Sequence, residues 1–433
     1  MNALRAIAGV ALFVGFVVTL VNAFTPFFSY WLGGAWLWLA GLILFFDLDA
    51  KQKTLTLLIA SLACVGWLVA WQTGQFEDFI GVISVNQSMV VMLIGVQFLQ
   101  LVALPTGGEG EKLPKGESGF IKSYVGAHLF SSVINLSVVL LLADRWIKEG
   151  PLTATQLKLL TRTFCSAANW SPFFAAFAAT MVFTPGASLM MVIPIGLAMA
   201  SAAFVLTWLE VRNDNTAALK NFVGYPMHFN ALWLPAMLVL LVFVLHWLLP
   251  TIKVLLLIAL SAVLLSLVVL IVRKGLYQGG LDFQSHVQTK LPNMKSELLL
   301  FLIAGVLGAG VASALDGLSI AIPMTHFDGM SASITLFCIL TLAVVGVHPV
   351  ISIAVIGHWI SGIQPNETLL ALMFLMSWAI GAAFSPVSGV SLALQGRYGV
   401  SGWSLFRWNL GYAIKMYGAA CLMLFLVSYL LKL

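Results

Sequence analysis

Two stretches of this sequence place a serine-proline pair inside a long apolar run. Residues 164–177 read FCSAANWSPFFAAF, and residues 381–394 read GAAFSPVSGVSLAL. Proline lacks an amide donor and clashes with the carbonyl four residues earlier, so each pair is expected to break a helix. A break exposes amide groups that suit an anion and carbonyls that suit a hard cation such as sodium. The two stretches therefore predict binding sites built from main-chain dipoles.

Polar but uncharged side chains surround both pairs and could complete such sites. They are Ser166, Asn169 and Ser171 in the first stretch and Ser385, Ser388 and Ser391 in the second. Their amide and hydroxyl groups can hold a small anion, and a coupling Na+ is expected near Asn169 and Ser385. No other metal site, no organic cofactor and no catalytic residue are expected.

Histidines offer proton coupling as an alternative, because imidazole titrates near physiological pH. His128 and His348 lie upstream of the two serine-proline pairs. A histidine in an apolar run is also typical of a hydrogen-bonded structural residue, so both interpretations stay open. Arg397 is interpreted either as a guide for an anion or as a positive-inside anchor. No Asp or Glu lies deep in an expected span, so proton exchange at a membrane carboxylate is not indicated.

The composition places these stretches in a membrane. Of 433 residues, 61% are hydrophobic and only 9% are charged, against about 25% charged in a soluble domain. Apolar runs of eighteen or more residues recur along the chain, each long enough to cross a bilayer as a helix. We therefore expect an all-α polytopic membrane protein. Basic residues lie singly, so the net charge of +5 does not indicate nucleic-acid binding.

Loop charges suggest how the spans are threaded. Basic residues favour the cytoplasmic side, and their distribution predicts a cytoplasmic N-terminus, about eleven full spans and an external C-terminus in a cell inner membrane. The alternation holds only if two stretches, residues 121–143 and 331–361, are re-entrant hairpins. Aqueous loops are expected at 105–122 and 273–297.

The hairpins and serine-proline helices recur as a repeat. VGAHLFSSV at 125–133 and VGVHPVISI at 345–353 share G-x-H-x-x-x-S, and each precedes a broken helix, at about 155–182 and 367–394. The first broken helix starts on the cytoplasmic side near Lys158 and Arg162, whereas the second ends there at Arg397. Such an inverted repeat with interrupted helices indicates a transporter binding site. The expected organisation is scaffold helices at 1–79, a first repeat at 80–208, connecting helices at 209–296 and a second repeat at 297–433.

This pattern resembles the ion transporter superfamily, whose members include divalent-anion/sodium symporters and dicarboxylate carriers. The resemblance covers roughly residues 120–208 and 331–431. It implies substrate and sodium binding between hairpin tips and unwound helices, an elevator-type movement and a homodimer. By position, it implies hairpin-tip contacts at Ser131, Ser132 and Ser352.

The expected function is secondary active transport of a small, carboxylate-like organic anion, coupled to Na+ or H+. Two alternatives stay open. The same scaffold could carry an inorganic ion or an amphiphile, or the protein could be an intramembrane enzyme using Ser388 with His348. The repeat has no explanation in the enzyme alternative, so no enzymatic activity is expected.

Overall fold

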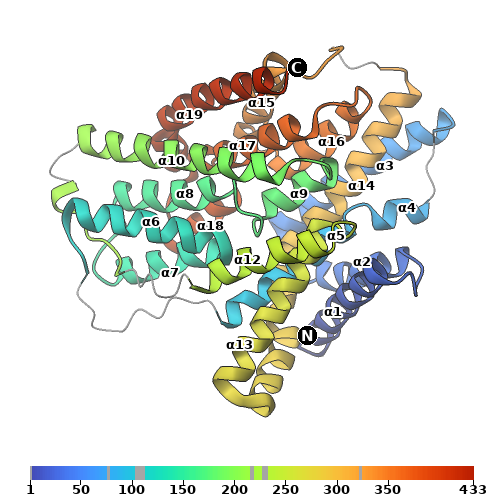
Figure 1. The fold of residues 1–433 in the computed structure, drawn as a ribbon, viewed down its shortest axis with the longest axis horizontal. Helices are drawn as coiled ribbons and strands as arrows, with labels where there is room; N and C mark the ends of the chain where they lie inside the picture. Colours follow the sequence, from blue (N-terminus) through green and yellow to red (C-terminus); the bar gives the residue numbers. More distant parts are fainter. Residues whose placement is uncertain (1, 76–78, 103–112, 215–218, 227–232, 321–323) are drawn as a thin grey trace. The chain divides into compact units, whose positions relative to one another are not determined.

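The computed structural model describes residues 2–75, 79–102, 113–214, 219–226, 233–320 and 324–433. Within these ranges the chain is helical and forms no β-strand ladder beyond one isolated bridge. The all-α class expected from the sequence is therefore confirmed for the described residues (Figure 1). Because amide and carbonyl groups need partners inside the bilayer, helices are the structure that such apolar runs must form.

Seven helical segments of the described chain are long and apolar enough to cross a membrane, judged by length and composition. They are Ala3–Phe24, Ala50–Gln72, Ile80–Leu101, Leu189–Asn213, Val254–Gly317, Glu367–Tyr398 and Gly402–Leu430. Shorter apolar helices lie between them, including Trp31–Phe45 and Gly329–Val344. The number of crossings and the sidedness stay predictions.

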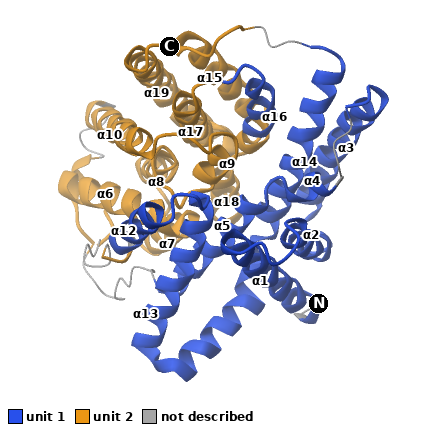
Figure 2. Cartoon of the chain, turned by 45° about the vertical axis from the view of Figure 1, so that its right-hand side comes forward, with its two compact units in different colours: residues 1–103, 236–323, 353–364 blue, residues 104–235, 324–352, 365–433 orange. Residues whose placement is uncertain are grey.

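The chain divides into two compact units, each assembled from segments far apart in sequence (Figure 2). Unit 1 comprises residues 1–103, 236–323 and 353–364, and unit 2 comprises residues 104–235, 324–352 and 365–433. The division into a scaffold and two repeats stays a prediction.

Unit 1 contains the N-terminal helices and the helices of the middle of the chain. Its helices are α1 (Asn2–Phe24), α2 (Trp31–Phe45), α3 (Ala50–Gln72), α4 (Phe79–Ser84), α5 (Gln87–Gln97), η1 (Phe98–Leu101), most of α12 (Trp233–Leu248), α13 (Val254–Ser285), η3 (His286–Lys290), η4 (Leu291–Met294), α14 (Lys295–Gly317) and most of α16 (Pro349–Ser361). Small residues let these helices approach closely: a side chain at Gly66 of α3 would collide with the backbone of Gly310 in α14. Trp67 donates its indole N–H to the carbonyl of Val306 at 3.0 Å beside this contact.

The stretch 273–297, expected to be an aqueous loop, is helical in the structure; its position relative to the membrane stays a prediction. Here α13 continues to Ser285, η3 and η4 follow, and α14 begins at Lys295. The only turn inside α13 is at Gly275, whose φ of 78° a residue without a side chain adopts easily. Beyond it, Lys274 and Gln278 both contact Asp282, so charged residues here support a helix rather than end it. The loop expected at 105–122 lies partly outside the described residues; from Gly116 onward it is helical.

Unit 2 contains both serine-proline stretches. Its helices are α6 (Gly116–Ile134), α7 (Leu136–Ile147), α8 (Ala154–Ala167), α9 (Ala175–Phe183), α10 (Leu189–Asp214), α15 (Gly329–Val344), the first turn of α16 (Pro349–Ser361), α17 (Glu367–Phe384), α18 (Gly389–Tyr398) and α19 (Gly402–Leu430). Side-chain caps fix the start of several of them. Thr153 and Gln156 form a capping box at α8, and Asn366 caps α17 through the amides of Thr368 and Leu369.

Candidate functional site

The first serine-proline stretch interrupts one helix and starts another. α8 ends at Ala167, α9 begins at Ala175, and residues 168–174 between them form turns. Pro172 has no amide to donate to the carbonyl four residues earlier, so a continuous helix cannot pass this point. The amides of Asn169 and Ser171 instead bond back to Ser166 and Ala167 at 3.2 and 3.0 Å. The helix therefore stops where the sequence places its proline.

The second stretch interrupts its helix over a shorter distance. α17 ends at Phe384 and α18 begins at Gly389. Ser388 caps α18 by accepting the amide of Ser391 at 3.3 Å, and its hydroxyl donates to the Ser391 hydroxyl at 3.0 Å. Ser391 in turn donates to the carbonyl of Ser385 at 2.8 Å. All three predicted serines of this stretch thus lie together, and all three are buried.

The serine that precedes each proline makes the same contact in both stretches. The Ser171 hydroxyl donates to the carbonyl of Ser132 in α6. The Ser385 hydroxyl donates to the carbonyl of Ala343 in α15, at 2.7 Å. Both acceptors lie in the last turn of their helix, immediately before the chain turns into α7 or α16. Each interruption is therefore tied to the first helix of the stretch expected to form its hairpin.

The same two hydroxyls also accept an amide from two residues further along the chain. These amides belong to Phe173, at 3.2 Å, and to Val387, at 3.4 Å. A serine hydroxyl has one proton to give, and here that proton is committed to a main-chain carbonyl. Ser171 and Ser385 consequently shape the interruptions, and neither offers a free hydrogen to a bound solute.

Asn169 differs from the serines because half of its amide has no partner. Its Nδ2 donates to the Ser166 carbonyl at 3.1 Å, whereas its Oδ1 is buried without a hydrogen bond. The residue is only 1% exposed. An unsatisfied buried carbonyl oxygen costs about 1–3 kcal/mol, and buried polar groups are otherwise nearly always bonded. The position of Asn169 Oδ1 suits an incoming proton donor or a cation.

His128 connects α6 to the first interruption through both ring nitrogens. Nδ1 lies 3.1 Å from the Thr163 carbonyl and 3.0 Å from the Ser166 hydroxyl, and Nε2 lies 2.9 Å from the indole nitrogen of Trp170. A carbonyl can only accept and an indole N–H can only donate. These partners place the proton on Nδ1 and leave Nε2 as the acceptor, which describes a neutral imidazole.

The second histidine also contacts a tryptophan, but in a different geometry. His348 accepts the amide of Val350 on Nδ1 at 3.2 Å, and its ring meets Trp378 of α17 edge to face, with 5.2 Å between centroids. The corresponding distance from His128 to Trp170 is 5.9 Å. Ser388 bonds to Ser391 and not to His348 among the described hydrogen bonds, so no serine–histidine pair of the kind required for nucleophilic catalysis is formed there.

The hairpin-tip positions implied by the family resemblance are buried close to these contacts. The Ser132 hydroxyl donates to the Leu129 carbonyl at 2.7 Å. The hydroxyls of Ser131 and Ser352 are buried without hydrogen-bond partners. α6 gives way to α7 at Asn135, whose φ of 56° turns the chain, and Gly346 (φ 101°) lies in the turn between α15 and α16.

All predicted site residues belong to unit 2. In the first stretch, hydrogen bonds join His128 and Asn169 to Ser166, and Ser171 to Ser132. In the second stretch they join Ser385, Ser388 and Ser391. α17 packs against both α8 and α9, so the helix of the second stretch lies beside the first interruption. No group of three or more His, Cys, Asp or Glu side chains in the described part of the chain could hold a metal ion.

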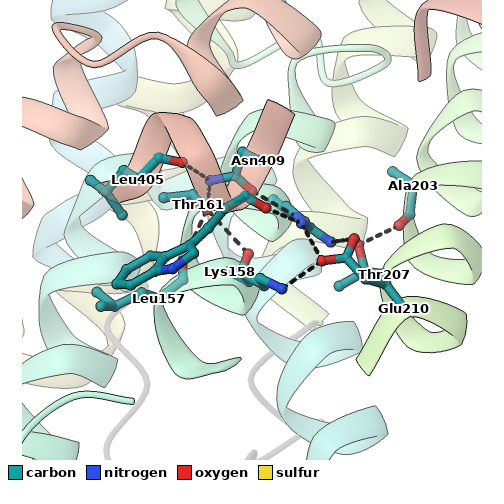
Figure 3. A network of polar contacts seen from close by, with 10 residues as sticks. Leu157, Lys158, Thr161, Ala203, Thr207, Glu210, Leu405 and Asn409 are labelled. Atoms are coloured by element: carbon teal, nitrogen blue, oxygen red, sulfur yellow. Dashed lines mark hydrogen bonds and ion pairs between the residues drawn. The ribbon is translucent and has the colours of Figure 1, made fainter. Parts of the chain in front are cut away.

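Unit 2 also contains a buried charged network that the sequence pattern does not reveal (Figure 3). The pattern places Arg162 at the cytoplasmic start of a broken helix, but its side chain is completely buried. Its two terminal nitrogens bind both carboxylate oxygens of Glu210 in α10, at 2.9 and 3.1 Å. Lys158 adds a second cation to Glu210 at 2.6 Å. α8 and α10 are therefore joined by an ion pair whose acidic member lies near the C-terminal end of α10.

The same guanidinium also binds α19. Its Nε donates to Asn409 Oδ1 at 2.8 Å and Nη2 donates to the Trp408 carbonyl at 3.0 Å, while the Tyr412 ring lies 4.4 Å from Cζ. The Asn409 amide nitrogen donates to the Leu405 carbonyl at 2.9 Å. Isolated polar residues in apolar helices, such as Glu210 and Asn409, are the sequence signal that could have found this network.

Arg397 has an acidic partner. It binds Asp144 of α7 with Nε at 3.0 Å and Nη2 at 2.7 Å, and the Tyr398 hydroxyl donates to the same carboxylate at 2.7 Å. α7 and α18 are thereby joined at their C-terminal ends. The two interpretations of Arg397 given above stay predictions.

The comparisons with known proteins give a fold but no family. A scan against models of known protein families finds no match, and no curated protein sequence matches the chain. Among solved structures, the chain is similar to the YdaH transporter of Alcanivorax borkumensis, described as having an unusual topology. The TM-score is 0.57 at 10% identity, over 86% of this chain and 97% of that one. At this identity the similarity establishes a shared fold.

Proposed function

We propose that this protein is a secondary active transporter of a small, carboxylate-like organic anion, driven by Na+ or H+ across the inner membrane. The observation that carries the proposal is the pair of interrupted helices in unit 2, each tied through the serine of its serine-proline pair to the end of a preceding helix. Interruptions at corresponding positions of two halves of a chain are a feature that points to a transporter binding site. The fold shared with a transporter supports the same function class.

In this proposal, the anion binds at the amino end of α9. Phe174 at that end provides no side-chain cap, so the first amides of α9 are not satisfied in that way. Free amides and the helix dipole attract negative charge. The equivalent end of α18 is already capped by Ser388, which makes α9 the better anion site.

The coupling ion in this proposal is Na+, bound by oxygens beside the first interruption. Asn169 Oδ1 is buried without a partner, and an amide oxygen is a ligand that a hard cation accepts. Proton coupling at His128 is less well supported, because protonating Nε2 would break the bond from Trp170. Elevator-type movement and a homodimer are part of the proposal through the resemblance to the ion transporter superfamily.

Counterflow in proteoliposomes tests this function. Purified protein is first screened by thermal shift against small carboxylates, sulfonates and inorganic anions, each with NaCl or choline chloride. The best ligand is then loaded inside vesicles, and entry of labelled ligand is followed. We expect acceleration by internal ligand and a dependence on external sodium.

The matched variants are Asn169→Ala and Ser377→Ala. Ser377 is a buried serine of α17 whose hydroxyl bonds only within its helix, to Phe374 at 2.7 Å. Asn169→Ala should abolish counterflow, whereas Ser377→Ala should preserve it. Flux of inorganic anions alone would favour the alternative cargo, and hydrolysis without flux would favour an enzyme.

A further inference from the structure

Arg162, in the second half of α8, binds two other helices of unit 2. Four of its N–H groups have acceptors: two on Glu210 of α10 and one each on Asn409 and Trp408 of α19. A bidentate guanidinium–carboxylate pair is geometrically specific as well as strong. The Arg162 side chain is completely buried and that of Glu210 is 14% exposed, so these bonds are largely shielded from water.

Just past the C-terminal end of α8, the chain meets α10 again, through a contact that only glycine permits. A side chain at Gly196 of α10 would collide with the carbonyl of Asn169 and with Cβ of Trp170. The first interruption therefore lies directly on the α10 backbone. α8 and α10 touch at two levels, with an ion pair at one and close backbone packing at the other.

These two contacts determine how far α8 can slide along α10. Asn169 follows Arg162 by seven residues, or about 10 Å of helix, so a shift at the ion pair is transmitted to the interruption. We propose that Arg162 is a positioning residue that, with Gly196, sets the register of α8 on α10 and thereby places Asn169. The consequence for transport rests on the proposed function; the consequence for local structure does not.

Arginine is required here because of its shape. Lysine keeps the charge but offers a single ammonium point, so it cannot grip both Glu210 oxygens and also reach Asn409 and Trp408. Lys158 already supplies one ammonium to Glu210 at 2.6 Å. Arg162→Lys therefore preserves the net charge of the network and removes only its geometry.

Hydrogen–deuterium exchange of the purified full-length protein tests the register proposal. For Arg162→Lys, we expect amides in 168–174 to exchange about tenfold faster, with no change in 381–394. The matched control is Arg145→Lys, because Arg145 pairs locally, with Glu149 just past the end of α7 at 3.5 Å. That variant should leave 168–174 unchanged.

A second variant covers failure of Arg162→Lys to fold. Gly196→Ala leaves the ion pair intact and pushes on Asn169 from the other side, so it should accelerate exchange in the same segment. Unchanged exchange in 168–174 for both variants would overturn the proposal, as would an equal rise in 381–394, which indicates general loosening.

Transport separates this proposal from the proposed function. With the ligand that passes the counterflow assay, Arg162→Lys should raise KM about tenfold while changing kcat less, since the displaced group binds rather than moves. Faster exchange in 168–174 together with no flux from the wild-type protein would leave the register proposal standing and reject the transporter. An unchanged KM, in a variant with faster exchange, would reject the link from Arg162 to binding.

Discussion

At the scale of single residues, hydrogen-bond partners separate groups that shape unit 2 from groups that can receive a solute. Ser171 and Ser385 give their protons to main-chain carbonyls, and His128 uses both ring nitrogens. Asn169 Oδ1, by contrast, is buried without a donor. The sequence names all four residues as site candidates because of their types and spacing, but only atomic contacts distinguish these roles.

Replacing Asn169 with leucine should remove function without removing stability. The variant loses one hydrogen bond to Ser166 and also loses an oxygen that is costly to bury, so the net change should stay within about 1 kcal/mol. Thermal unfolding in detergent and counterflow, measured on the same preparation, check this. A large fall in thermal midpoint would show that the residue is structural.

Replacing Ser171 or Ser385 with alanine should lower stability instead. Each change leaves the acceptor carbonyl of Ser132 or Ala343 buried without its donor, at a cost of about 1–3 kcal/mol. Ser377→Ala is the matched comparison and should cost less. Its acceptor, the Phe374 carbonyl, lies in the middle of α17, where a main-chain amide also bonds to it, whereas the carbonyls of Ser132 and Ala343 lie in a last helical turn. Equal thermal midpoints for the three variants would contradict the structural role assigned to the hydrogen bonds from Ser171 and Ser385 to main-chain carbonyls.

At the scale of helices, the sequence predicts interruptions better than it predicts extents. The two serine-proline pairs fall where α8 and α17 end, because a missing amide stops a helix regardless of its surroundings. Residues 273–297, however, were expected as a loop and are largely helical, because charge alone does not end a helix. The Arg162 network was missed because its partners lie 48 and 247 residues away.

Pro172→Ala should have a milder effect than Asn169→Ala. Alanine restores an amide, but the serine tie to α6 and the packing of Gly196 still hold residues 168–174 away from helical geometry. We expect reduced but measurable counterflow. Complete loss, in a protein with normal thermal stability, would show that the proline itself is needed.

A charged contact between α1, α14 and the turn from α2 to α3 should make the stability of unit 1 depend on pH. Asp47, between α2 and α3, binds Lys295 of α14 at 3.0 Å and Arg5 of α1 at 3.1 Å. The hydrogen bond from Lys295, with the nearby positive charges, holds the pKa of Asp47 below its ordinary range. A lowered folded-state pKa contributes stability above the ordinary value, which is lost as the pH falls through the folded value.

We therefore expect the thermal midpoint of the wild-type protein to fall as the pH drops below about 4, and Asp47→Asn to show less of this fall. The two proteins should converge at the acidic end, where the wild-type carboxyl is protonated. Parallel curves across the whole range would mean that Asp47 does not contribute.

At the scale of the whole molecule, composition predicts a polytopic membrane protein. The membrane topology is a separate prediction that can be measured. An odd number of crossings, as the loop charges predict, places the two termini on opposite sides of the membrane. Reporter fusions should place the N-terminus in the cytoplasm and the C-terminus outside. If both termini lie on the same side, one of the expected hairpins is a full span or another span is present. The two halves would then not be antiparallel as predicted.

The hydrogen bonds from Ser171 and Ser385 to main-chain carbonyls have one further consequence, for how the sequence of this protein can change in evolution. Each bond joins a serine side chain to a main-chain oxygen, so it requires a particular residue only at the serine position. Positions 132 and 343 are free to accept other residues without losing the bond. Covariation across related sequences should therefore pair neither serine with its acceptor position, although the two atoms are in contact.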